Sequence, residues 1–181
     1  LHQVNRLAAK LRRTNETLRL SRSELRRLVK RDLITGCGNR EALQLRLEEE
    51  WHRCRRSGET LSCLCLVLQA MPEIHRDHGH RAGDALLQGI VQAIRKRMRI
   101  TDHLYRWSDD TLVLLASDCP PQAAHQLSGE LSAAIAAVHL IPEDGGPLEL
   151  RTNAGIGIST LDSDCTAPEE LLERARHNAL S

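Results

Sequence analysis

Residues 61–69 of the chain are LSCLCLVLQ, a short apolar run with β character. Its length and its continuous apolar content predict a buried central strand. Two more apolar segments follow at 102–107 and 111–116, and the tripeptide SDD at 108–110 between them is typical of a tight hairpin. These three segments predict a sheet that contains an antiparallel hairpin.

Helical patterns alternate with these strands. Apolar residues at helical spacing predict a helix over residues 84–98, and Pro120 and Pro121 mark the start of another that runs to residue 138. Further helices are expected over 41–56 and 168–180, further strands within 148–159, and loops at 75–83 and 145–147. The alternation indicates an α+β domain with a central sheet and helices on its faces.

The first 31 residues follow a different pattern, with a period of seven. Apolar residues occupy most core positions of this heptad frame, and Asn15 and Arg22 occupy two others. A polar core residue lowers the stability of a coiled coil, fixes its register and favours two strands. We therefore expect a parallel dimeric coiled coil over 1–31 and a separate domain over 32–181; the alternative is a single amphipathic helix packed on its own domain. The apolar core positions are Leu1, Val4, Ala8, Leu11, Leu18, Leu25 and Val29.

Composition argues against some classes of partner. The chain has 181 residues, with 25 Lys and Arg against 24 Asp and Glu, no Phe, two Trp and one Tyr. The near balance of charge gives no overall field that would attract nucleic acid, and so few aromatic side chains provide no platform for stacked bases. No apolar run is long enough for a membrane span or a signal peptide, so we expect a cytoplasmic chain, or the cytoplasmic part of a larger, membrane-anchored protein, without a nucleic-acid partner.

The cysteines and histidines give no metal-binding pattern. The six cysteines lie at positions 37, 54, 63, 65, 119 and 165 and form no CxxC pair, so we expect reduced thiols. Cys63 and Cys65 alternate along the expected central strand and should face the same side of it. His75, His78 and His80 lie in the expected loop without the helical spacing of a metal site, so no metal is predicted there.

Four short segments carry a resemblance to a known family. Residues 32–40, DLITGCGNR, resemble the pattern D-x-L-T-G-x-x-N-R, and residues 79–84, GHRAGD, match G-H-x-x-G-D. GIGI at 155–158 resembles a late S-I-G-I strand, and LLERA at 171–175 resembles the start of a final L-L-x-x-A-D helix. In this order and spacing the segments resemble the GGDEF family, the diguanylate cyclase domains that make cyclic di-GMP from two GTP molecules. The resemblance implies a nucleotidyl-cyclase-like, mostly antiparallel central sheet flanked by helices, here preceded by a long N-terminal helix.

The signature that names this family is changed in the chain. Where the family has Gly-Gly-Asp-Glu-Phe, the chain has Ser108, Asp109, Asp110, Thr111 and Leu112. In the family the two glycines let the backbone approach the nucleotide phosphates. A side chain there obstructs that approach, and the negative charge of Asp109 repels a triphosphate.

The metal ligands that the resemblance implies are also missing. Thr111 replaces the signature Glu, and Val67 stands where the family has a metal-binding Asp; Val offers Mg²⁺ no oxygen ligand. Asp110 remains the single candidate ligand at the hairpin. Of the two residues that contact guanine in the family, Asp84 is retained and His75 replaces an Asn. We therefore expect a catalytically inactive domain that requires no cofactor, with Mg²⁺ relevant only to residual GTP binding or turnover.

A further family feature is intact. Many GGDEF domains bind their product cyclic di-GMP at an inhibitory R-x-x-D site placed five residues before the signature, and Arg99 and Asp102 stand at that offset. Arg can donate to guanine O6 and N7 or to phosphate, and a carboxylate can accept from guanine N1 and N2. The pattern also occurs at 81–84 and 106–109, so only the offset singles out Arg99. The alternative is a surface salt bridge that adds little stability. Candidates to reach the ligand's other phosphate are Arg53, Arg55 and Arg56.

These observations predict a regulatory binding module. It would sense cyclic di-GMP at Arg99 and Asp102 and communicate through the coiled coil with an upstream sensor, or with a downstream output such as an EAL-type phosphodiesterase domain. Two alternatives stay open at this point. One is a weak or atypical diguanylate cyclase that converts two GTP into cyclic di-GMP, and the other is a dimeric scaffold that binds no nucleotide.

Overall fold

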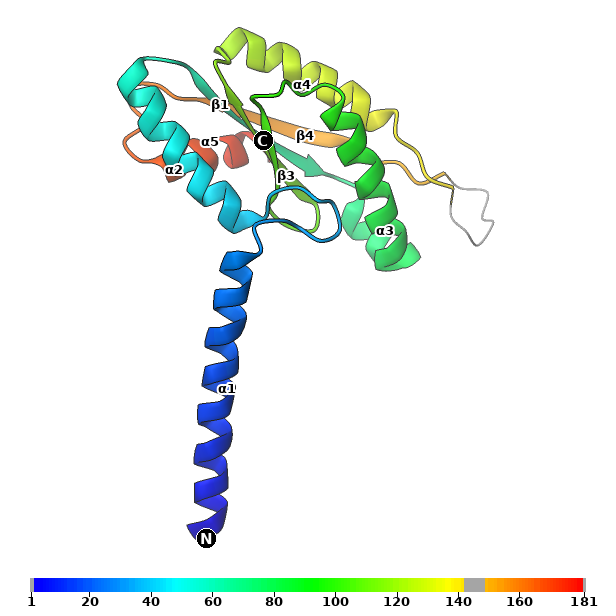
Figure 1. The fold of residues 1–181 in the computed structure, drawn as a ribbon. Helices are drawn as coiled ribbons and strands as arrows, with labels where there is room; N and C mark the ends of the chain where they lie inside the picture. The colour runs from blue at the N-terminus through cyan, green and yellow to red at the C-terminus, as the bar shows by residue number, and fades with distance from the viewer. Residues whose placement is uncertain (1, 142–148, 181) are drawn as a thin grey trace.

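The computed structural model describes residues 2–141 and 149–180, with backbone alone at residue 2 and at residues 23–28. A four-stranded antiparallel sheet with the order β2-β3-β1-β4 forms the centre of the fold (Figure 1). β1 pairs with a strand on each side, and its apolar run is continuous because both faces of the sheet are covered at this strand. The predicted central strand and hairpin are confirmed. The strands are β1 (Leu61–Leu68), β2 (His103–Arg106), β3 (Thr111–Ser117) and β4 (Ala154–Thr160).

Two pairs of helices cover the two faces of this sheet. α3 and α4 pack on one face, and α2 and α5 pack on the other (Figure 1). Alternate residues of β1 point to opposite faces, so Leu66 joins the core under α3 and α4, whereas Cys63 and Cys65 join the core under α2 and α5. The α+β class predicted from the sequence is confirmed. The helices are α2 (Arg40–Ser57), α3 (Met71–Arg95), α4 (Pro121–Ala136) and α5 (Pro168–Ala179).

The cysteines belong to these cores as small apolar groups. All six are buried free thiols. Burial raises the pKa of Cys65 to about 11 and raises the pKa of Cys63 above its usual value as well, so both thiols stay neutral near pH 7. The prediction that Cys63 and Cys65 face one side of their strand is confirmed, since both lie in the same core.

Two glycines allow α5 to lie directly on the backbone of β4. A Cβ atom at Gly157 would come within 2.0 Å of the Ala175 carbonyl oxygen, and one at Gly155 within 2.8 Å of the Ala179 carbonyl oxygen. Asn178 also donates from Nδ2 to the carbonyl of Ile158, at 2.9 Å. The GIGI segment is therefore needed for close packing of a helix on an edge strand.

The prediction of a loop over residues 75–83, followed by a helix from residue 84, is wrong. α3 already begins at Met71, and a single residue with non-helical angles, Gly79 with φ 80° and ψ 168°, interrupts it. A glycine adopts such a positive φ without steric cost, so the helix kinks there and then continues. Most side chains between residues 75 and 82 are exposed, so this polar stretch forms the solvated side of the helix. The same helix ends at Arg95, before the predicted end at residue 98.

The segment between α4 and β4 differs in part from its prediction. β4 begins only at Ala154, although strands were expected from residue 148. Leu150 forms one isolated antiparallel bridge with Leu140 before β4 starts. The loop predicted at 145–147 lies outside the described residues.

The N-terminal helix α1 (His2–Leu28) extends away from the domain (Figure 1). Every side chain from residue 3 to residue 22 is exposed, including Val4, Leu11 and Leu18 of the heptad frame. Over these residues the helix does not pack on its own domain; the dimer stays a prediction. The heptad residues Leu1 and Leu25 lie outside the described side chains. In the described part of the chain, no helix combines the length and the apolar character that crossing a membrane requires.

Candidate functional site

Arg99 and Asp102 form a tight turn between α3 and β2. The Asp102 carboxylate accepts a hydrogen bond from the backbone N–H of Arg99, at 2.7 Å, and the Asp102 N–H donates to the Arg99 carbonyl, at 3.1 Å. Asp102 is 7% exposed, whereas the Arg99 side chain is exposed. The buried carboxylate thus fixes the backbone of the turn, and the arginine side chain extends from it into solvent.

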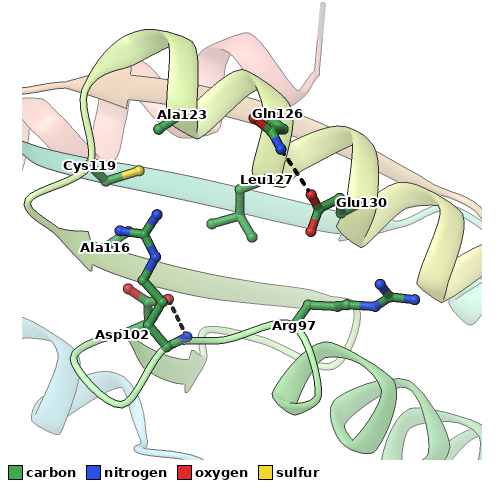
Figure 2. Close-up of a pocket in the computed structure, with 9 residues that line it drawn as sticks. Arg97, Asp102, Ala116, Cys119, Ala123, Gln126, Leu127 and Glu130 are labelled. Atoms are coloured by element: carbon green, nitrogen blue, oxygen red, sulfur yellow. Dashed lines mark hydrogen bonds between the residues drawn. The ribbon is translucent and has the colours of Figure 1, made fainter.

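A hollow of about 130 Å³ lies between this turn and α4 (Figure 2). Ala116, Cys119, Ala123 and Leu127 provide apolar lining. Arg97 and Asp102 lie on the side of the turn, and Figure 2 shows Gln126 and Glu130 across from them on α4. Gln126 donates from Nε2 to Glu130 Oε1 at 3.3 Å. The hollow therefore offers apolar contact for a flat ring, with charged and hydrogen-bonding groups around its rim.

Arg99 also borders a second hollow, of about 610 Å³, which it shares with Arg53. Arg53 donates to Glu50 at 2.8 and 3.0 Å and to Glu59, and its side chain is 40% exposed. Burial raises the pKa of the Glu50 carboxyl, but hydrogen bonds from Arg53 and Ser117 outweigh this and hold the pKa below its usual value. Glu50 is therefore an anion at neutral pH, and it orients Arg53, which lines the same hollow as Arg99.

The other two arginines of the predicted cluster lie elsewhere. The Arg55 guanidinium is 5.1 Å from the centre of the Trp51 ring and donates to the Cys165 carbonyl. Arg56 is exposed in the last turn of α2 and lines neither of the two hollows. Of the three arginines, the structure brings Arg53 alone together with Arg99.

The changed signature forms the tip of the β2–β3 hairpin. Asp110 Oδ1 accepts hydrogen bonds from the hydroxyls of Ser108, at 2.8 Å, and Thr111, at 2.9 Å. Thr111 is paired with Val67 of β1 in the sheet register, and Leu112 is fully buried in the core. The side chains facing each other where the hairpin meets β1 are thus a hydroxyl and an isopropyl group.

These residues do not fit the Mg²⁺ ions that the family resemblance implies. Mg²⁺ needs several oxygen ligands, and Val67 offers none from its side chain. Asp110 is the one carboxylate left in the position of a signature ligand, and two hydroxyls already bond to it. Within residues 2–141 and 149–180, no three His, Cys, Asp or Glu side chains are grouped so that they could hold a metal ion.

An arginine that the sequence analysis did not single out anchors this hairpin. Arg106, 9% exposed, pairs with Asp32 at 3.2 Å and donates from Nε to the Ser108 carbonyl at 3.2 Å. It also lies 3.5 Å from the exposed Asp109. Burial raises the pKa of Asp32, but hydrogen bonds from Thr35 and the charge of Arg106 outweigh this and lower it. Arg106 therefore fixes the hairpin to the segment that follows α1.

Trp107 adds a second anchor at the same place. Two guanidinium groups lie over its ring, that of Arg40 at 3.7 Å and that of Arg176 at 5.0 Å from the ring centre. Such stacking joins the hairpin to the start of α2 and the end of α5 by cation–π attraction. The sequence signal for both anchors is their position directly before the changed signature.

The two residues expected to contact a nucleotide base both lie on α3. The His75 ring packs against Gly83, where a Cβ would come within 2.2 Å of it, and the neighbouring residue is Asp84. The His75 and His80 rings are 4.7 Å apart. His75 Nε2 is buried without a hydrogen-bond partner among the described residues. Gly83 of the GHRAGD segment therefore makes room for an imidazole ring.

Sequence comparison identifies relatives of this chain. The family model "Diguanylate cyclase, GGDEF domain" matches residues 29–181. The diguanylate cyclase DgcP of Pseudomonas aeruginosa is 38% identical over 144 residues, which are 80% of this chain and 21% of that protein. An uncharacterized signaling protein of Caulobacter vibrioides is 31% identical over 159 residues, which are 87% of this chain and 19% of that protein. The chain therefore spans about a fifth of the length of these relatives.

Solved structures show the same fold. A sensory box/GGDEF family protein from Caulobacter crescentus superposes with a TM-score of 0.75 at 30% identity, covering 84% of this chain and 96% of that one. The coiled coil and GGDEF domain of DgcB from the same organism, solved with c-di-GMP, gives a TM-score of 0.79 at 16% identity, covering 96% of this chain and 92% of that one. Because the family model covers residues 29–181 and the fold agrees, this chain belongs to the GGDEF family.

Proposed function

We propose that this GGDEF domain is catalytically inactive and binds cyclic di-GMP at Arg99 and Asp102, as a regulatory module in bacterial second-messenger signalling. The observation that carries the proposal is the turn itself: Asp102 fixes the backbone of Arg99, and Arg99 lines two hollows. The hollow beneath α4 has the lining for a guanine ring, with Asp102 and Glu130 at its rim as acceptors for base N–H groups.

Arg53 supports the phosphate side of this proposal. It lines the larger hollow together with Arg99, so two guanidinium groups border one space. Guanidinium groups bind phosphate oxygens through paired, charge-assisted hydrogen bonds. A ligand phosphate placed there would compete with Glu59, an exposed partner of Arg53, while Glu50 would keep Arg53 in position.

The residues of the hairpin support the part of the proposal that concerns catalytic inactivity. Phosphoryl transfer depends on positioned metal ions that neutralise developing charge. Val67 and Thr111 provide no carboxylate where the resemblance places two. We expect no cyclic di-GMP from GTP with Mg²⁺ or Mn²⁺, measured by chromatography of the reaction products. Detectable product would overturn this half of the proposal in favour of a weak cyclase.

Binding is tested by calorimetric titration of cyclic di-GMP into the wild-type chain and two variants. Arg99→Ala should weaken binding on the order of 100-fold, because a charged ligand group loses its partner. Arg81→Ala is the matched control, since Arg81 and Asp84 have the same R-x-x-D spacing on α3; its affinity should equal that of the wild type. Equal affinity of Arg99→Ala and wild type would refute the site, and no binding at all would favour a scaffold.

The regulatory role includes a dimer formed through residues 1–31. Val4, Leu11 and Leu18 are exposed on α1 at heptad spacing, and two copies would cover them in a parallel coiled coil. The double variant Leu11→Asp/Leu18→Asp should be a monomer by sedimentation equilibrium. Leu20→Asp is the control, since Leu20 is exposed outside the core positions and should leave the dimer intact. A monomeric wild type would contradict the dimer.

A further inference from the structure

The chain is nearly neutral overall, but its basic and acidic residues are distributed unequally between two parts of the sequence. Residues 1–31 contain ten of the 25 Lys and Arg residues but only two of the 24 Asp and Glu residues, a formal charge of +8. The other 150 residues contain 15 basic and 22 acidic residues, a formal charge of −7. Such asymmetry between two parts of a chain is typical of proteins that meet a charged surface.

The basic charge is accessible on α1. Of the ten basic residues, six lie in the segment 3–22, where every side chain is exposed. The helix extends away from the acidic domain, so its charge is not neutralised by that domain (Figure 1). The six are Arg6, Lys10, Arg12, Arg13, Arg19 and Arg22.

These charges do not compete with the heptad core. Only Arg22 occupies a core position, so a coiled-coil dimer would leave the other basic side chains on its outside. Arg6, Arg13 and Leu20 follow one another at intervals of seven residues, which places them along one line of the helix surface away from the core positions. Leu20 is 68% exposed on this basic line.

We propose that this outer, basic face of α1 binds the headgroup surface of an anionic lipid bilayer. Clusters of Lys and Arg on a helix are attracted to anionic lipids, and an exposed Leu among them gives an apolar group that enters the interface. A nucleic acid would use the charges but not Leu20, which favours lipid. The acidic domain would be repelled from the same surface, so the helix would hold it away from the bilayer.

Binding is measured by co-sedimentation of the full chain with vesicles. The protein should co-sediment with vesicles of phosphatidylcholine that contain phosphatidylglycerol, but not with vesicles of phosphatidylcholine alone. Salt at about 0.5 M should release it, because the attraction is screened. Equal binding to both kinds of vesicle, or to neither, would overturn the proposal.

Matched variants locate the surface. Arg6→Gln/Arg13→Gln/Arg19→Gln should lower the partition coefficient on the order of 100-fold, since each charge near the surface contributes to binding. The control removes three charges from the domain, as Arg76→Gln/Arg151→Gln/Arg174→Gln, and should bind as the wild type does. Equal losses in both would show dependence on net charge alone and refute the role of α1.

Two further measurements test whether lipid is the ligand of α1. Leu20→Ser should lower vesicle binding several-fold with no change of charge, and an unchanged partition coefficient would contradict insertion at the interface. Tighter binding to a DNA duplex than to anionic vesicles at equal salt would reassign the surface to nucleic acid. Far-ultraviolet circular dichroism and thermal unfolding confirm that each variant is folded.

Discussion

The turn at residues 99–102 and the hairpin tip at residues 108–111 lie at the two ends of the short strand β2, and they match the family pattern to different extents. The turn keeps an arginine and a buried carboxylate in one hydrogen-bonded unit. The hairpin has Val67 and Thr111 where the family resemblance places carboxylates. In the proposed function, ligand binding and catalysis use different side chains at the two ends, so one could be lost while the other remained.

Contacts of two neighbouring side chains, Arg106 and Trp107, anchor the hairpin. Arg106 is joined to Asp32 and to the Ser108 carbonyl, and Trp107 contacts the guanidinium groups of Arg40 and Arg176. None of these contacts needs the signature glycines. A hairpin held in this way preserves the position of β2, and with it the position of the turn at β2's other end.

The largest effect is expected when this anchor is removed. Arg106→Ala leaves Asp32 partly buried without its cation, so the free energy of unfolding should fall by about 3 kcal/mol. Urea denaturation at pH 7 measures it. Arg76→Ala is the control, since Arg76 pairs with its exposed neighbour Asp77 and its loss should change stability little. A loss below about 1 kcal/mol would mean that the anchor does not hold the hairpin.

A smaller effect is expected for the charge in the turn. Asp102→Asn keeps an oxygen that can accept from the Arg99 N–H but removes the anion offered to guanine. Affinity for cyclic di-GMP should fall about 30-fold, or about 2 kcal/mol, with little loss of stability. Titration together with thermal unfolding measures both. Unchanged affinity would show that Asp102 only shapes the turn.

A modest pH dependence of stability should reveal the ion pair between Asp32 and Arg106. The pKa of Asp32 in the folded protein lies below its ordinary value of 3.8, so its contribution to stability is present above that value and is lost as the pH falls through the folded pKa. The stability difference between wild type and Asp32→Asn should be constant above about pH 5 and shrink toward pH 2.5. Urea midpoints across this range measure it, and a constant difference at every pH would contradict the ion pair.

The smallest effect is expected at the tip of the hairpin. Asp109 is 80% exposed and lies 3.5 Å from Arg106, so Asp109→Gly should change the free energy of unfolding by no more than about 0.5 kcal/mol. It should also leave cyclic di-GMP binding unchanged. A loss above about 1 kcal/mol in urea denaturation would place the exposed pair among the anchors.

Much of the fold could be predicted because local pattern determines it. The continuous apolar run of β1 and the SDD turn between two apolar segments specify the sheet and its hairpin. The loop predicted at 75–83 is wrong because polar residues and two glycines also suit a solvated helix. A single positive φ at Gly79 and the contact of His75 with Gly83 allow that helix to form.

The candidate site was predictable only in part. The turn around Arg99 is formed by residues that are close in sequence, so the spacing of Arg99 and Asp102 could be recognised from the sequence alone. The burial of Arg106 and the position of Arg53 beside Arg99 depend on contacts between segments far apart in the chain. In a chain with many arginines, no sequence signal separates Arg53 from the exposed ones, and Arg106 is marked by its position before the changed signature alone.

The most direct test of the separation between binding and catalysis is one calorimetric experiment, in which cyclic di-GMP is titrated into wild type, Arg99→Ala and Asp110→Asn. We expect Arg99→Ala to lose most of its affinity for cyclic di-GMP. Asp110→Asn should bind it as tightly as the wild type does, because Asp110 belongs to the hairpin and not to the turn. Equal loss in both variants, or undiminished binding by Arg99→Ala, would contradict this expectation.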